Sequence, residues 1–161
     1  MSRRVNVRGI IVKDGKLFAV RHRWLDGSGK DFWCTPGGGL EDGETLHEGI
    51  RREMTEETGI APVIGRILWI YQFRKPVEAP YPETECLEFF FHIENADDYE
   101  LIDLSQTTHG TEELIETGFI DPKSINFKPI QMQEIDLNEL LSSPAPLMTS
   151  AIRLDLPQAE G

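Results

Sequence analysis

Apolar and polar residues alternate near the start of the chain with the period of two that is typical of β-strands. Val5 and Val7 alternate with Arg4, Asn6 and Arg8, which predicts a half-buried strand. Asp-Gly at positions 14 and 15 favours a type I′ turn, because both central residues of such a turn need positive φ. The stretch that follows, Lys16 to Arg23, is therefore expected to return as the second strand of a hairpin.

Two longer apolar stretches lie in the middle of the chain. Val63–Arg74 and Glu85–Glu94 both have the composition of strands, and the second places Phe89 and Phe91 on one face and Glu88 on the other. Residues 75–83, between these stretches, contain three prolines and are expected to form a loop.

The helical period of 3.6 appears clearly in one place. Leu46, Ile50 and Met54 fall on one stripe of a helix. Thr45 followed by Glu48 is the pattern of a capping box at its start, and Gly59 suits the left-handed residue that ends a helix. Pro129–Leu141 shows a second helical pattern, with the spacing of Ile130, Leu137 and Leu141.

Composition places these elements in one soluble domain. We expect a domain over residues 1–142 and a flexible C-terminal tail over residues 143–161, where periodicity fades. No apolar run approaches the ~20 residues of a membrane span, and the first residues lack the apolar core of a secretory signal. We expect a cytoplasmic protein without a membrane partner. The net charge of −12 argues against a nucleic-acid polymer as partner, because binding a phosphate backbone needs a basic surface.

The predicted helix carries three carboxylates at an unusual position. Glu53, Glu56 and Glu57 lie beside the apolar stripe and not on the opposite, solvated side. A charge cluster on a helix is ordinarily a solvated face. Here the carboxylates repel one another and resist burial unless a cation neutralises them. Mg²⁺ or Mn²⁺ suits such hard oxygen ligands and also binds phosphate oxygens.

The stretch Pro36–Ile60, PGGGLEDGETLHEGIRREMTEETGI, resembles the signature of the Nudix hydrolases. From Gly38 the spacing is glycine, five residues, Glu44, seven residues and then REMTEETGI. The resemblance implies an α/β protein with the Nudix fold, an α/β/α sandwich with a mixed β-sheet. It also implies Mg²⁺-dependent cleavage of a nucleoside diphosphate linked to another group, such as a nucleotide sugar, an ADP-ribose-like compound or a nucleoside triphosphate.

Site residues follow from the spacing and the resemblance together. Glycines at 37, 38 and 39 let the backbone approach a metal or a phosphate closely. The resemblance implies that a carbonyl of this loop, which we expect to be that of Gly37, joins Glu53, Glu56 and Glu57 as a metal ligand. Gly38 and Gly39 are expected to contact substrate. Arg52 lies one turn from Glu56 and is expected to hold its carboxylate; the alternative is an ordinary surface arginine.

The general base is left open by the sequence. Glu53 and Glu57 lie within the signature, and family members differ in whether the base lies there or in a later loop. Outside it, Glu113 and Glu116 precede an aromatic residue that the family often has, and Glu88 is a further candidate, as a base or as a metal ligand. Each of these three outside residues has the alternative of being a surface acid.

Substrate contacts are the least determined part of the prediction. Arg21, Arg23 and Lys30 are candidates for phosphate contacts, against the alternative of solvated loop cations. Trp24 is a candidate for stacking a base, with burial as the alternative. Residues 75–83 and 95–110 are expected to set specificity. A small nucleotide is the expected partner, and a homodimer is left open. The competing hypothesis is a Nudix-fold module that binds a nucleotide without turnover.

Overall fold

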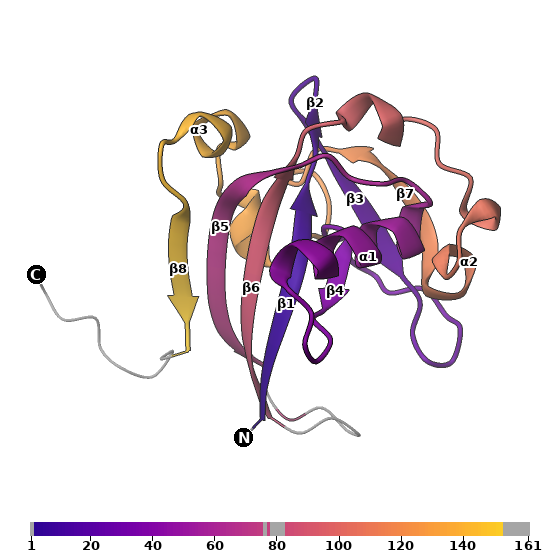
Figure 1. Ribbon diagram of the computed structural model, residues 1–161, viewed down its shortest axis with the longest axis horizontal. Coiled ribbons are helices and arrows are strands. Elements are labelled where there is room, and N and C mark those ends of the chain that lie inside the picture. Colours follow the sequence, from indigo (N-terminus) through magenta and orange to yellow (C-terminus); the bar gives the residue numbers. More distant parts are fainter. Residues whose placement is uncertain (1, 76, 78–82, 153–161) are drawn as a thin grey trace, which may run out of the picture.

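A computed structural model describes residues 2–75, 77 and 83–152, and Figure 1 shows their arrangement. The strands are β1 Ser2–Ile10, β2 Val12–Lys13, β3 Lys16–His22, β4 Gly37–Gly39, β5 Ile64–Lys75, β6 Thr84–Ile93, β7 Leu114–Ile120 and β8 Leu147–Ala151. The helices are α1 Leu46–Thr58, α2 Gly110–Glu113 and α3 Leu137–Ser142, with 3₁₀ helices η1 Ala96–Tyr99, η2 Leu104–Gln106 and η3 Ile130–Gln133.

Within this part of the chain the strands form two sheets. The larger has the order β4-β1-β6-β5-β8, and the smaller has the order β2-β3-β7. β1 runs parallel to β6 and β5 runs parallel to β8, whereas the other pairs are antiparallel. The predicted mixed sheet and α/β fold are therefore confirmed.

Apolar residues are buried on both faces of the larger sheet. One core joins α1 to β1, β3 and β6 through Val7, Phe18, Ile50, Met54 and Phe91. The other core lies between the larger sheet and the residues that follow β7, including η3 and α3. Its members include Trp69, Phe90, Met132 and Leu140. Figure 1 shows α1 in front of β1 and β4. Helix α1 and its glutamates therefore rest directly on the sheet.

Local signals predicted the hairpin and the main strands correctly. Asp14 and Gly15 both have positive φ, 50° and 74°, as the predicted turn requires. β5 and β6 match the predicted strands to within one residue at each end. Phe91 belongs to the core beside α1 and Phe90 to the opposite core, which confirms the predicted alternation of β6.

Two predicted segments differ from the structure. The single helix predicted over Pro129–Leu141 is wrong: η3 and α3 are separate, because Asp136 caps a new helix by accepting from the amides of Asn138 and Glu139. Residues 147–151 of the predicted tail form β8, which pairs with β5, so a flexible tail is wrong for these residues. Residues 153–161, and most of the predicted 75–83 loop, lie outside the described residues.

None of the described helices is long and apolar enough to cross a membrane.

Candidate active site

Helix α1 is held at both ends by local contacts that its sequence predicts. The Thr45 hydroxyl accepts from the Glu48 amide at 3.2 Å, and the Glu48 carboxylate accepts from the Thr45 amide at 2.8 Å. Gly59 ends the helix in the left-handed conformation with φ 74°. Ile50 and Met54 are fully buried against the sheet. This anchoring fixes the rotation of α1 and therefore the direction of its glutamates.

The three consecutive glycines form strand β4, which pairs with β1. Of the three, only Gly37 has positive φ, at 135°. Space explains the other two. A Cβ on Gly38 would lie 2.6 Å from the Glu53 carboxylate, and a Cβ on Gly39 would lie 2.9 Å from the Arg4 guanidinium. β4 thus allows the Glu53 carboxylate to lie against the backbone.

Glu57 is the most deeply buried carboxylate of the signature, with 1% exposure. Its Oε2 accepts from the Gly37 amide at 3.0 Å. Its Oε1 has no hydrogen-bond partner among the described residues. Desolvation raises the pKa of Glu57 to about 8, although the Gly37 amide and the charge of Arg8 act in the opposite direction. Leaving a buried oxygen without a hydrogen-bond partner destabilises the fold, and a ligand bound at Oε1 would remove that cost.

His22 is the neighbour of that unpartnered oxygen, with Nε2 at 3.8 Å from Glu57 Oε1. Burial, followed by the positive charges of Arg8 and Lys30, lowers the pKa of His22 to about 3. The imidazole is therefore neutral, and the contact is not an ion pair. The sequence left His22 without a role, because only the fold brings the end of β3 to α1.

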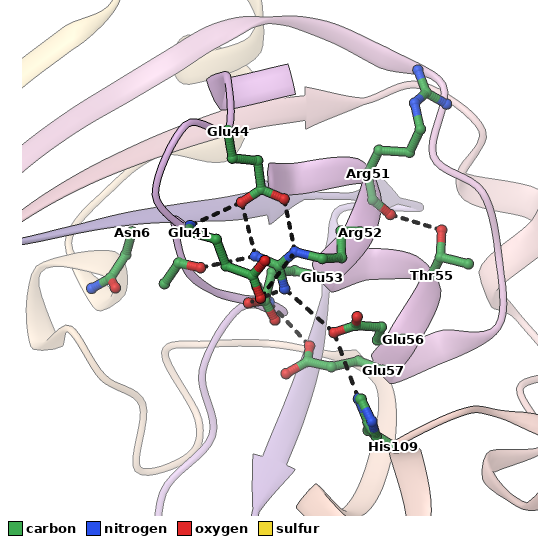
Figure 2. Close-up of polar contacts among 12 residues, drawn as sticks. Asn6, Glu41, Glu44, Arg51, Arg52, Glu53, Thr55, Glu56, Glu57 and His109 are labelled. Atoms are coloured by element: carbon green, nitrogen blue, oxygen red, sulfur yellow. Dashed lines mark hydrogen bonds and ion pairs between the residues drawn. The ribbon is translucent and has the colours of Figure 1, made fainter. Parts of the chain in front are cut away.

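Arg52 forms hydrogen bonds with three other carboxylates of the signature, as Figure 2 shows. Its guanidinium donates to Glu44 at 2.7 Å, to Glu53 at 2.9 Å and to Glu56 at 3.4 Å. It also donates to the Gly39 carbonyl at 3.0 Å. The predicted contact with Glu56 is confirmed. The contact with Glu44 gives a physical reason for a glutamate at that position of the signature.

The oxygens of the site suit a divalent metal in their chemistry. They are the carboxylates of Glu53, Glu56 and Glu57 and the Gly37 carbonyl, all hard ligands. Among the described residues no three acidic, histidine or cysteine side chains already converge as a metal site, because Arg52 holds Glu53 and Glu56. Glu57 Oε1 is the buried oxygen of the site that lacks a hydrogen-bond partner in the described part of the chain and to which a metal could bind.

Glu88 lies on β6 and pairs with a cation of the chain. Its buried carboxylate accepts from Arg8 at 3.3 Å and from the Asn6 side chain at 3.1 Å. Arg8 also donates to the carbonyls of Thr35 and Gly37, each at 3.3 Å. Glu88 and Arg8 therefore support the loop that carries the Gly37 carbonyl. No local pattern in the sequence marks Arg8 for this role.

The later acidic candidates separate in space. Glu113, at the end of α2, is exposed, and its pKa is raised first by desolvation and then by the charge of Glu53. Its carboxylate thus lies within electrostatic reach of the helix glutamates. Glu116 on β7 instead pairs with Arg21 at 3.0 Å. Glu113 therefore lies near the site. Arg21 and Glu116 form an ion pair with each other.

Arg23 follows β3 and donates to the carbonyls of Thr111 and Gly27. It lines a pocket of about 590 Å³ together with Arg4, His22 and Glu113. Another neighbour of the site is His109, whose Nδ1 lies 3.6 Å from the Glu56 carboxylate (Figure 2) and whose amide donates to the Glu56 carbonyl. The sequence left His109 unassigned.

Comparisons with known proteins identify similar sequences. A family model described as the NUDIX domain matches residues 2–139. An RNA pyrophosphohydrolase of Hydrogenovibrio crunogenus is 33% identical over 128 residues, which cover 73% of this chain and 73% of that protein. An ADP-ribose pyrophosphatase of Methanocaldococcus jannaschii is 39% identical over 67 residues. That match covers 42% of this chain and only 38% of the relative's length.

The fold also matches solved structures. The solution structure of the Escherichia coli ORF135 protein superposes with a TM-score of 0.65 at 19% identity, covering 90% of this chain and 96% of that chain. At this identity the likeness concerns the fold alone.

Proposed function

Because this chain belongs to the Nudix hydrolase family, we propose that it is a divalent-metal-dependent pyrophosphohydrolase of a nucleoside diphosphate linked to another group. The observation that carries the proposal is the complete signature, Pro36–Ile60, folded so that Glu53 and Glu57 lie against the β4 backbone. The two curated relatives described above are both named as enzymes that cleave pyrophosphate bonds. The two names give different substrates, so what supports the proposal is that both enzymes cleave a pyrophosphate bond.

Nudix enzymes typically use a divalent metal. We propose that Mg²⁺ or Mn²⁺ is held here by Glu53, Glu56, Glu57 and the Gly37 carbonyl. When bound, the metal neutralises pyrophosphate charge and activates the attacking water. Glu88, which pairs with Arg8, is a further candidate ligand outside the signature.

The chain's own residues prepare these ligands. In the absence of metal, Arg52 offsets part of the negative charge of Glu44, Glu53 and Glu56 and so reduces their mutual repulsion. The Gly37 amide orients Glu57 through Oε2 and leaves Oε1 available. The site is thereby held together before a ligand arrives.

Glu113 is the best-placed general base outside the helix. In the proposed reaction the oxygen of water forms a bond to phosphorus, and a carboxylate of the chain accepts the water proton. The bridging bond between phosphorus and oxygen breaks, and its electron pair leaves with the departing phosphate. A raised pKa makes Glu113 a better proton acceptor than an ordinary exposed carboxylate. Glu53 is the alternative within the signature, but it is held by Arg52.

The proposal is tested with a panel of nucleotide sugars, ADP-ribose, dinucleoside polyphosphates and oxidised nucleoside triphosphates, each with and without Mg²⁺. We expect a nucleoside monophosphate as one product of at least one compound, only with the metal. Tight binding of a nucleotide without turnover across the whole panel would instead identify a binding module.

A further inference from the structure

A pocket of about 590 Å³ lies beside the acidic helix, between the end of β3, the loop after it and α2. Its lining includes Arg4, His22, Arg23, Trp24, Lys30 and Glu113. We propose that this pocket binds additional phosphate groups on the leaving part of the substrate. The inference rests on the proposed function and narrows it to nucleoside triphosphates and dinucleoside polyphosphates, in preference to nucleotides linked to an uncharged sugar.

Three residues that line the pocket lie close to residues of the site. His22 lines it and lies 3.8 Å from Glu57. Arg4 lines it and lies against Gly39 of β4. Glu113 lines it and is within electrostatic reach of Glu53. A group in the pocket would therefore adjoin the pyrophosphate that is cleaved at the helix glutamates.

Two guanidinium groups in the pocket keep their positive charge available. Arg23 donates to the carbonyls of Thr111 and Gly27, and Arg4 donates to the side-chain carbonyl of Asn6. These acceptors are uncharged, and neither arginine has a carboxylate within ion-pair distance in the described part of the chain. Neutral acceptors fix a cation in position without neutralising it, which suits a site for an anion.

Other arginines near the site differ in this respect. Arg8 is paired with Glu88, and Arg21 with Glu116. The chain as a whole carries a net charge of −12. In such a chain, two arginines that line one pocket and donate only to uncharged acceptors favour a polyanionic ligand.

Trp24 and Lys30 form the wall of the pocket beside Arg23. The Lys30 ammonium lies 4.8 Å from the centroid of the Trp24 ring, which positions its charge by a cation–π contact. The Trp24 residue is 43% exposed. The volume falls in the range of small-molecule sites, about 300–1,000 Å³, which leaves room for more than one phosphate.

The first test measures binding of inorganic tripolyphosphate to the metal-free protein by calorimetry. We expect wild type to bind it, and R23Q and K30Q each to weaken binding by roughly 10-fold or more, the loss of one charge-assisted hydrogen bond. K16Q is the matched control: Lys16 is an exposed lysine at the far end of β3 from His22, and its variant should bind as wild type does. No binding, or equal binding by all variants, would overturn the inference.

The second test compares kcat/KM for a dinucleoside tetraphosphate with kcat/KM for ADP-ribose. R23Q and K30Q should each lower kcat/KM for the tetraphosphate, relative to kcat/KM for ADP-ribose, by roughly 10-fold or more. K16Q should leave this ratio unchanged. Equal losses on both substrates would overturn the preference for extra phosphates. If tripolyphosphate binds as expected but no compound is hydrolysed, the proposed function is wrong and the anion site remains.

Discussion

Glu57 combines deep burial, an amide donor at one oxygen and no partner at the other. Its pKa is raised from 4.5 to about 8, so the metal-free fold favours the neutral acid. A metal ligand must be ionised, and binding a metal at neutral pH should therefore release a proton. Glu57, which has to be ionised to bind a metal, is therefore also the most deeply buried carboxylate of the signature.

The raised pKa gives a pH dependence with a definite sign. The folded state binds the Glu57 proton more tightly than the unfolded state does, so its contribution to stability is complete below about pH 4.5 and is lost as pH rises through about 8. We expect the free energy of unfolding of the metal-free protein to fall over this range, by an amount on the order of a few kcal/mol. Urea denaturation in the presence of a chelator measures it.

The matched control for this titration is Glu57→Gln, which keeps the shape of the side chain but does not ionise. Its free energy of unfolding should fall less steeply with pH than that of wild type. Two parallel profiles would show that Glu57 is already ionised in the metal-free fold.

Some residue roles could be predicted from spacing and others could not. Arg52 and Glu56 are one helical turn apart, so their contact follows from the sequence. Arg8 and His22 reach the site only because β1 and β3 lie beside β4 and α1. No local pattern marks such residues. The contact between Glu88 and Arg8 could not be predicted for the same reason, since the two residues are 80 positions apart.

The secondary-structure elements also divide into those that local sequence predicts and those that depend on contacts distant in sequence. Helix α1 was predicted to within a residue, because its capping box, apolar stripe and terminal glycine are local features. β8 was missed, because a short strand after a proline-rich stretch is stabilised by its pairing with β5, far away in sequence. The break between η3 and α3 was missed because the apolar spacing outweighed the capping signal of Asp136.

β4 offers a paired test of the site's geometry. In Gly38→Ala the new Cβ would lie 2.6 Å from the Glu53 carboxylate, which Arg52 holds in place, so Glu53 has to move. We expect roughly a 10-fold or greater loss of activity, because outer changes that displace a metal ligand typically cost 10–100-fold. Steady-state kinetics with saturating Mg²⁺ measures this.

The neighbouring Gly39→Ala is the control. Its Cβ would meet the end of the flexible Arg4 side chain at 2.9 Å, which can move at little cost. Activity on ADP-ribose should then exceed that of Gly38→Ala. Equal losses in the two variants would contradict the role given to Gly38.

The attachment of β8 can be tested at Thr149. The fully buried Trp69 donates its indole N–H to the Thr149 hydroxyl at 2.8 Å. Thr149→Ala removes the acceptor and should lower the free energy of unfolding by about 1–3 kcal/mol, the cost of an unsatisfied buried donor. Thr149→Ser keeps the hydroxyl and should recover most of the loss in urea denaturation. If serine is as destabilising as alanine, the hydrogen bond is not the cause.

At the scale of the molecule, the sheet separates two cores and supports the site at the edge of one of them. The net charge of −12 argues against a nucleic-acid polymer as partner, which stays a prediction. Its distribution is more informative: carboxylates gather around Arg52 and cations gather in the neighbouring pocket. Such a distribution depends on tertiary structure and cannot be derived from composition.

The central claim is that the carboxylates of α1 hold the metal that cleaves a pyrophosphate. The most direct measurement is Mg²⁺-dependent hydrolysis by wild type and by Glu57→Gln, on whichever compound wild type cleaves, with circular dichroism to confirm that the variant is folded. The account predicts that the folded variant loses roughly 100-fold or more of the activity, because a metal ligand matters at least as much as its supporting residues. A folded Glu57→Gln protein with the activity of wild type would contradict it.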